Sequence, residues 1–418
     1  MNSTSKQLDK LDLRITSRNL AKQIFAADLP EQYIRTIPAQ SLYIALKHNG
    51  LAASADLIEI ADIEQCRLMI DFDCWHKSYF HEENFWEWLS LSSEDDGLTV
   101  LQKLIKCFDL KIITLLMTRY VNFEFFEEAT DTPPAPGYYT PDKGMTWIYI
   151  NIEDSEKHFL FGRLLALLFE TDADLFYKLL TLSSTQTSAV LEEEAYQDKI
   201  KRLAAEGIPE YEHAEAVNNA ADDNQISALL TDTRDSAKII NIQAVEPLIF
   251  DSGINSRFNH LLQDISIREA LRIELTYIMN SAIVFWGVEF FEYEEMMRLS
   301  DKVKGAINIG LEKCEEISNS DLSDIYKKLG LIKIYQYGLL QLKKMRLALK
   351  EIKSKLQVES IESSLGVVLD LGSLAFPEMP EFLKKNAADE SEPELSTKST
   401  AIESLQSIER ILQFCRRK

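Results

Sequence analysis

Residues 57–69 read LIEIADIEQCRLM and residues 104–116 read LIKCFDLKIITLL, and these two blocks are the main indication of the fold. In each, the apolar end of one helix is followed by an aspartate, Asp62 or Asp109, and then by a second amphipathic helix. An aspartate at a helix start accepts hydrogen bonds from backbone N–H groups that the helix leaves unpaired. The blocks lie 47 positions apart (109 minus 62), and a looser third copy surrounds Asp172. Such a period is typical of stacked helical hairpins, although chance similarity between amphipathic helices gives the same pattern.

The periodicity changes between the second and third blocks. Residues 121–125 alternate between apolar and polar, and residues 146–152 are β-branched and aromatic. Proline and glycine turn signals lie between them, within residues 132–144. The pattern predicts a small two-stranded ribbon at about 121–152, inserted into the helical domain. Because two strands alone are only marginally stable in water, we expect the ribbon to pack against a helix.

Composition favours helices in the rest of the chain. Its 418 residues include 14 glycines and 11 prolines, fewer than turn-rich sandwiches and barrels use. We expect a mostly α fold in which stacked helical hairpins with the ribbon are followed by a helical bundle domain. The expected parts are an N-terminal tail and first helix (1–30), the hairpin domain (31–217), an acidic polar linker (218–240), the C-terminal helical bundle (241–376), a disordered acidic segment (377–400) and a C-terminal helix (401–418).

The bundle is expected to form around residues 320–356, where apolar residues step by threes and fours. Gly330 and Gly338 interrupt this pattern. Inside a helix, glycine costs about 1 kcal/mol relative to alanine. The two glycines therefore predict either a break in the helix or a close crossing with another helix.

Charge and cysteine content narrow the class of partner. The formal net charge is −22, and such a surface repels the phosphates of nucleic acids and anionic membranes. Five scattered cysteines fit a reducing compartment better than a disulfide framework. No stretch approaches the roughly 18 apolar residues of a membrane span, and the charged residues 1–14 do not resemble a signal peptide. We expect a cytoplasmic protein whose partner is another protein, with no nucleic acid and no membrane.

Reactive side chains concentrate in residues 71–88, whereas the common phosphate-binding, zinc-protease and nucleophile-elbow motifs do not occur in the sequence. Cys74, His76 and His81 are ligand types that zinc takes, but their spacing matches no recurring metal motif. An enzyme or metal-dependent regulator centred on these three residues is one hypothesis. The sequence implies no cofactor and no catalytic residue.

The same stretch is better interpreted as a packing corner. Asp71, Asp73, Cys74 and Trp75 end the second helix of the first block, and Trp88 follows at helical spacing in the next apolar segment. A buried cysteine beside tryptophan usually packs rather than reacts. Large rings at such a corner would hold the first hairpin against the next. We therefore expect these five residues to be structural.

Several blocks of sequence carry a resemblance to a known family. Residues 37–43 (IPAQSLY) and residues 71–75 (DFDCW) are the most specific of these blocks, and the likeness covers roughly residues 35–376. The chain resembles an uncharacterised bacterial family of helical cytoplasmic proteins with a domain of unknown function. That resemblance implies a helical architecture, and it implies no established activity or catalytic residues.

A weaker likeness, of architecture alone, is to the superhelical N-terminal domain of magnesium transporters. There, leucine-rich helices are separated by acidic turns, as around Asp62 and Asp109. We predict a non-enzymatic protein-protein interaction or scaffold protein, because stacked hairpins create extended grooves that suit protein partners. The sequence leaves the partner and the oligomeric state open.

Overall fold

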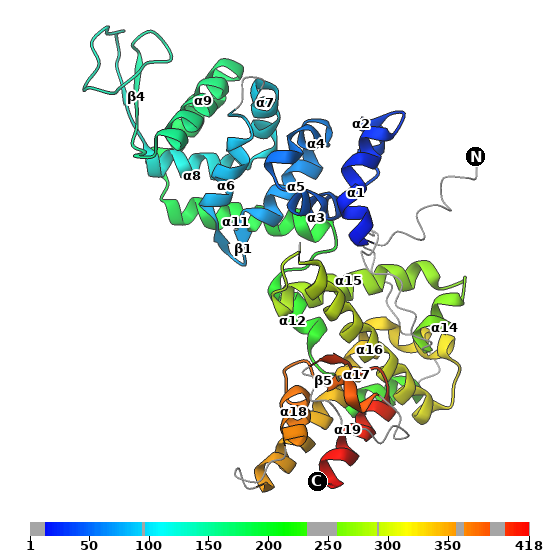
Figure 1. Cartoon of the computed structure of the whole chain (residues 1–418). Coiled ribbons are helices and arrows are strands. Elements are labelled where there is room, and N and C mark those ends of the chain that lie inside the picture. The colour runs from blue at the N-terminus through cyan, green and yellow to red at the C-terminus, as the bar shows by residue number, and fades with distance from the viewer. Residues whose placement is uncertain are drawn as a thin grey trace. The chain divides into compact units, whose positions relative to one another are not determined.

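Helices build most of the chain, as the computed structural model in Figure 1 shows. The structure describes residues 13–93, 97–231, 257–290, 292–356, 363–384 and 398–417. In these residues the only sheets are three two-stranded antiparallel pairs, which confirms the mostly α fold with small β-ribbons. The chain divides into two compact units, Met1–Leu203 and Ala204–Lys418. Within the described ranges, no helix has both the length and the apolar character that crossing a membrane requires.

The first unit is helical apart from two short hairpins. Its elements are α1 (Leu13–Ala26), α2 (Pro30–Ile34), α3 (Ala39–Asn49), η2 (Ala52–Ser54), α4 (Ala55–Ile60), α5 (Ile63–Asp73), β1 (Trp75–His76), β2 (Tyr79–Phe80), α6 (Glu82–Ser90), α7 (Gly97–Cys107), α8 (Leu110–Tyr120), β3 (Val121–Phe125), β4 (Thr146–Ile150), α9 (Ser155–Thr171), α10 (Ala173–Thr185) and α11 (Ser188–Ala205).

The three aspartates of the sequence blocks cap helices, as predicted. The Asp62 side chain accepts the N–H of Glu64 at 3.0 Å and forms a capping box with Gln65 at the start of α5. Asp109 accepts the N–H of Lys111 at 2.9 Å at the start of α8. Asp172 accepts the N–H of Leu175 at the start of α10. Each carboxylate satisfies backbone donors that the first helical turn cannot pair internally.

Apolar helix faces form the core of the first unit. α3 packs against α1 and α5, α5 against α7, and α8 against α10, which also contacts α9. Several of the largest side chains of this unit are almost fully buried, among them Tyr43, Met69, Trp88, Phe161 and Phe176. Burying one large apolar side chain contributes about 1.5–3 kcal/mol. This burial holds the helices together.

The predicted ribbon is present. β3 pairs antiparallel with β4, with Val121 opposite Ile150 and Phe125 opposite Thr146. β4 is almost wholly buried, whereas β3 is mostly exposed. A bridge from Tyr139 to Ile148 covers the other side of β4.

The second unit is a helical bundle with a small terminal sheet. Its elements are α12 (Tyr211–Asn218), α13 (Asp223–Thr231), α14 (Arg257–Gln263), α15 (Arg268–Trp286), α16 (Tyr293–Ser318), α17 (Leu322–Lys355), α18 (Ser363–Gly372), β5 (Glu378–Pro380), η4 (Glu381–Leu383), β6 (Ser399–Ala401) and α19 (Leu405–Arg417).

The two glycines of α17 take one predicted role each. Gly330 has a non-helical backbone with φ +69°, so it breaks the helix. Gly338 lies at a close crossing with α16, because a Cβ at this position would overlap the carbonyl oxygen of Ala306. Gly310 of α16 approaches the Ile334 carbonyl in the same way. Small residues let the two backbones approach each other closely.

The break at Gly330 is filled by a buried carboxylate. Glu274 of α15 accepts the Leu331 N–H at 2.6 Å and the Tyr326 hydroxyl at 2.8 Å. Burial raises the pKa of Glu274, and these two hydrogen bonds oppose the shift. The carboxylate thus supplies the acceptor that a continuous helix would have offered.

Four of the expected segments differ in extent from what the structure shows. The predicted linker, 218–240, contains α13, because Ile226 and Leu230 bury an apolar face that packs against α16 and α17; residues 232–240 lie outside the described ranges. The compact units divide after Leu203, before the predicted boundary. In the expected disordered segment, 377–400, the ends form β5 and part of β6, while residues 385–397 lie outside the described ranges. The expected C-terminal helix, 401–418, begins only at Leu405, because Ala401 pairs with Glu378.

Candidate functional site

The five residues of the predicted corner, Asp71, Asp73, Cys74, Trp75 and Trp88, lie where α5 turns into α6. A tight hairpin makes the turn, with Trp75 of β1 opposite Phe80 of β2. The hairpin loop places Lys77 at φ +56°, which tight two-residue turns require. The His81 N–H donates to the Cys74 carbonyl oxygen at 2.8 Å and closes the turn. We call this region the corner.

Asp73 joins three helices. Its Oδ1 accepts the Tyr43 hydroxyl at 2.8 Å and the Lys47 ammonium at 2.7 Å, both from α3. Its Oδ2 accepts the Trp88 indole N–H at 2.8 Å from α6. The Asp73 side chain is only 2% exposed, so these three donors take the place of water. A buried charge of this kind is tolerated only when it is paired and hydrogen-bonded.

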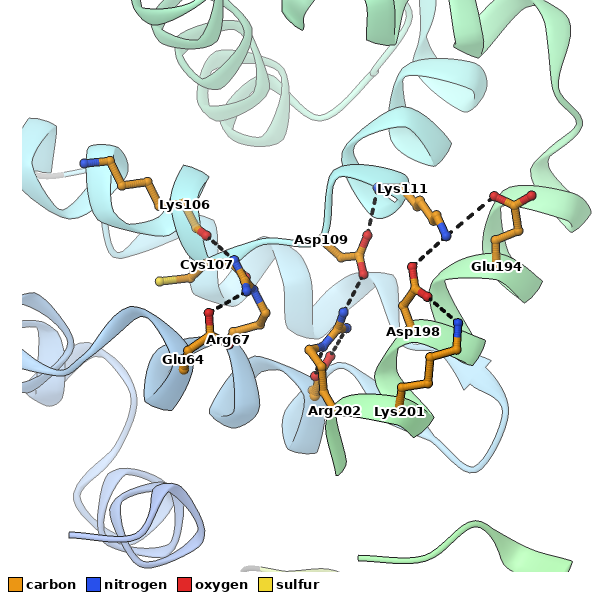
Figure 2. Close-up of polar contacts among 11 residues, drawn as sticks. Glu64, Arg67, Lys106, Cys107, Asp109, Lys111, Glu194, Asp198, Lys201 and Arg202 are labelled. Carbon is orange, nitrogen blue, oxygen red and sulfur yellow. Dashed lines mark hydrogen bonds and ion pairs between the residues drawn. The ribbon is translucent and has the colours of Figure 1, made fainter. Parts of the chain in front are cut away.

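Asp71 faces the opposite way and binds Arg202 of α11. The guanidinium donates to both Asp71 oxygens, from Nε at 2.7 Å and from a terminal nitrogen at 2.9 Å. Its other terminal nitrogen donates to Asp109 at 2.9 Å, as Figure 2 shows. Burial pushes the pKa of Asp71 upward and the bonds from Arg202 pull it down. Although burial opposes it, the two carboxylates raise the pKa of Arg202, so the arginine stays charged.

α11 carries further polar contacts to the corner and to α8. Lys111 of α8 donates to Asp198 at 2.6 Å, and Glu194 lies 3.7 Å from the same ammonium (Figure 2). The Lys199 ammonium lies over the ring of Trp75, 5.6 Å from its centroid, and donates to the Lys77 carbonyl oxygen at 3.1 Å. Burial lowers the pKa of Lys199 to about 8. The lysine therefore ties the β1–β2 hairpin to α11.

The three candidate metal ligands differ in exposure: Cys74 is buried, whereas His76 and His81 lie at the surface. Cys74 is 1% exposed, and burial, together with Asp73 and Asp71, raises the pKa of its thiol. Its sulfur is therefore kept in the protonated form, which binds metals poorly. His76 and His81 are exposed, with ring centroids 5.9 Å apart. In the described part of the chain, no group of three or more His, Cys, Asp or Glu side chains is arranged to hold a metal ion.

Comparison with known families identifies the chain. Residues 3–374 match the model of a family of unknown function, DUF6178. The chain belongs to this family. The match covers nearly the whole sequence and begins before residue 35, where the resemblance in the sequence starts. No curated protein and no solved structure matches the chain.

The corner of this DUF6178 member includes partners that the sequence did not reveal. Arg202 lies 131 positions from Asp71, and no local pattern links the two residues. Arg67 is another example: its guanidinium donates to Glu64 and to the carbonyl oxygens of Lys106 and Cys107 at the end of α7 (Figure 2). No backbone N–H within the helix donates to these last carbonyl oxygens, so a cation beside them is favourable.

Two buried thiols also meet beside Arg67. Cys66 of α5 hydrogen-bonds to Cys107 of α7. This bond and burial raise the pKa of Cys66, whereas the bond lowers the pKa of Cys107 and burial opposes that change. Both cysteines are fully buried, so the pair packs α5 against α7.

Glu82, at the start of α6, is a further carboxylate that accepts several hydrogen bonds. It accepts the Tyr120 hydroxyl at 2.6 Å, the Trp86 indole N–H at 3.1 Å and the Arg119 guanidinium at 2.7 Å. Arg119 also donates to Glu192 of α11 at 3.0 Å. Acidic side chains around the corner thus bond to donors on other helices.

Proposed function

We propose that this DUF6178 member is a non-enzymatic cytoplasmic protein that binds other proteins as an interaction or scaffold module. The observation that carries the proposal is the engagement of the corner carboxylates. Asp71 and Asp73 are buried and bonded to donors from three other helices. A catalytic acid or base must instead reach a substrate proton. The side chains that looked most reactive in the sequence are therefore occupied in joining helices.

The surface supports binding to protein. Several large apolar side chains of the first unit are exposed, among them Tyr79 at 70%, Phe159 at 56% and Phe125 at 53%. Aromatic side chains are enriched in protein interfaces. The net charge of −22 disfavours nucleic acid and favours a partner with a neutral or basic surface.

The test is capture of the partner by the whole chain. We would express the tagged full-length protein in its source cells, cross-link, and quantify co-purified proteins against an equally acidic tagged control. We expect one or a few proteins in near-stoichiometric amounts that rebind after separate purification. A folded chain that recovers nothing beyond the control would overturn the proposal.

The alternative is an enzyme or metal-dependent regulator centred on Cys74, His76 and His81. The feature that favours it is the pair of neighbouring exposed imidazole rings. The decisive measurement is elemental analysis of the purified chain after zinc loading and dialysis, with His76→Ala and Cys74→Ser variants as controls. Stoichiometric zinc that both substitutions abolish would establish this alternative; zinc retained equally by all three proteins, or by none, would eliminate it.

A further inference from the structure

β3 is the open edge of the ribbon. In the described residues it pairs with β4 alone, whereas β4 is bonded on both sides. Ile148 of β4 exchanges two backbone hydrogen bonds with Tyr139, at 2.9 and 2.8 Å. Its N–H and C=O therefore point away from β3. Ile148 and the opposite residue, Phe123, form a non-hydrogen-bonded pair of the antiparallel ladder.

It follows that the backbone of β3 offers bonds to a further strand. In a non-hydrogen-bonded pair, the N–H and C=O of Phe123 point outward from the ribbon, and those of Phe125, two residues on, do the same. An outward row of donors and acceptors is a template for another strand. In Figure 1 the ribbon labelled β4 projects away from α8 and α9.

The side chains beside this edge are aromatic. The ring centroids of Phe123 and Phe125 lie 5.1 Å apart, and that of Phe125 lies 6.4 Å from Tyr177 of α10. Phe125 is 53% exposed. An incoming strand would therefore find a partly open apolar surface for alternate side chains, which is how added strands gain specificity.

The charged side chains of β3 and of the segment that follows it, residues 121–137, are all acidic. Glu124, Glu127, Glu128 and Asp131 are exposed, and residues 121–137 contain no lysine or arginine. Pairing of this edge with the same edge of a second copy would bring like charges together, which is unfavourable. A strand that carries basic side chains would instead meet complementary charge.

We propose that the free edge of β3 binds an extended, lysine- or arginine-rich segment of a partner protein as an added third strand. The inference rests on the proposed function and names its binding surface and the chemistry of the partner. Backbone bonds from Phe123 and Phe125 provide the pairing, and Glu124 selects basic segments.

The test uses a defined peptide and the full-length protein. The probe is a fluorescein-labelled nine-residue peptide of alternating lysine and valine, followed by fluorescence anisotropy. A peptide of alternating glutamate and valine tests charge. A lysine–valine peptide with proline at two internal positions keeps the charge but cannot pair as a strand.

Two variants separate backbone pairing from charge. Phe123→Pro removes the outward N–H and leaves the β3–β4 bonds in place, because an edge strand tolerates proline on its open side. Glu124→Lys reverses one charge without changing the backbone. Glu59→Lys, an exposed residue of α4, is the matched charge control. Circular dichroism and thermal melting confirm that each variant is folded.

We expect the lysine–valine peptide to bind, and Phe123→Pro and Glu124→Lys each to weaken binding about tenfold, while Glu59→Lys changes it less than about twofold. Equal binding of the proline-containing peptide, or equal binding by Phe123→Pro, would mean that charge alone attracts the probe and would overturn the proposal. No binding by the folded wild-type chain would also overturn it. A dimer in sedimentation that Phe123→Pro abolishes would assign the edge to a second copy instead.

The same variant separates this inference from the general function. If partner capture from cells is retained in full by Phe123→Pro, proteins bind elsewhere and only the strand-addition proposal fails. If the wild-type chain captures nothing, the interaction function itself fails, whatever the peptide does.

Discussion

Trp88 and Trp147 are both buried in the first unit, but only one indole N–H has an acceptor. Trp88, at the corner, donates to Asp73 at 2.8 Å. Trp147, in the β3–β4 ribbon, is buried, and its Nε1 has no hydrogen-bond partner among the described residues. The hydroxyl of Tyr139, beside β4, also lacks a partner there. The corner uses its polar groups for internal cohesion. The ribbon leaves the Trp147 indole N–H without a hydrogen-bond partner among the described residues, and it leaves the outer edge of β3 without a partner strand.

The largest expected effect tests the corner through its packing. Trp75→Ala removes ring contacts with Phe80 and Tyr196 and the cation–π contact with Lys199. Replacing a buried tryptophan by alanine costs about 3–5 kcal/mol, so we expect the first unit to unfold or nearly so. Urea unfolding followed by tryptophan fluorescence measures this, because four of the five tryptophans lie in this unit. Native stability in the variant would show that the corner is not a packing centre.

The second effect tests the corner through its charge. Asp73→Ala leaves the Lys47 ammonium and the Tyr43 and Trp88 donors without their acceptor. Breaking a buried ion pair on one side costs about 3–5 kcal/mol, and the partial exposure of Lys47 places the expected loss near the lower end. Asp73→Asn, which keeps an acceptor oxygen, is the control and should lose less. Equal losses in the two variants would contradict the assigned role of the carboxylate.

The third prediction compares the two tryptophans directly. Trp88→Phe deletes a donor to a buried carboxylate and should cost about 1–3 kcal/mol. Trp147→Phe loses packing but also removes a buried N–H that has no acceptor among the described residues. Because the second change is favourable and offsets the first, the free energy of unfolding should change by close to zero. Chemical unfolding of both variants gives the difference. If Trp147→Phe is the more destabilising of the two, the contrast between corner and ribbon is wrong.

A smaller effect depends on pH. Burial lowers the pKa of Lys199 to about 8, below its ordinary value of 10.5. Between these two values the unfolded chain binds more protons than the folded one, so the lysine's contribution to stability rises with pH. We expect the free energy of unfolding of the wild type, minus that of Lys199→Met, to increase from pH 8 to pH 10 and to stay flat from pH 6 to pH 7.5. A flat difference across the whole range would mean that the amine is not perturbed.

The smallest expected effect is at the ribbon edge. Glu124 is exposed and lies on β3, whose outer edge has no partner strand among the described residues. Glu124→Lys should therefore change the free energy of unfolding by less than about 0.5 kcal/mol, although it weakens peptide binding. Thermal melting beside the wild type measures the change. A large loss of stability would show that the edge is used inside the fold.

Sequence patterns predicted the features that local chemistry determines. The caps at Asp62, Asp109 and Asp172 depend on residues two or three positions away. The break at Gly330 and the close crossing at Gly338 were predicted from glycine's own lack of a side chain. The sequence singled out residues 71–88 because rings and acids cluster there. Their bonds were not predicted, since Arg202 reaches Asp71 across 131 positions and leaves no periodic signal. α13 was not predicted because its sequence is mostly polar. Two apolar side chains, Ile226 and Leu230, are nevertheless enough to dock this short helix.

The position of α11 has a consequence for folding during synthesis. Arg202, Lys199 and Glu192 bond to residues 131, 122 and 112 positions earlier in the chain. At about 5–20 residues per second, a nascent chain waits roughly 7–26 s between making Asp71 and making Arg202. Until then Asp71 lacks its Arg202 partner, and the long sequence separation of these pairings delays their formation. The first unit should therefore complete its core only as its last helix leaves the ribosome, which makes α11 the closing step of its assembly.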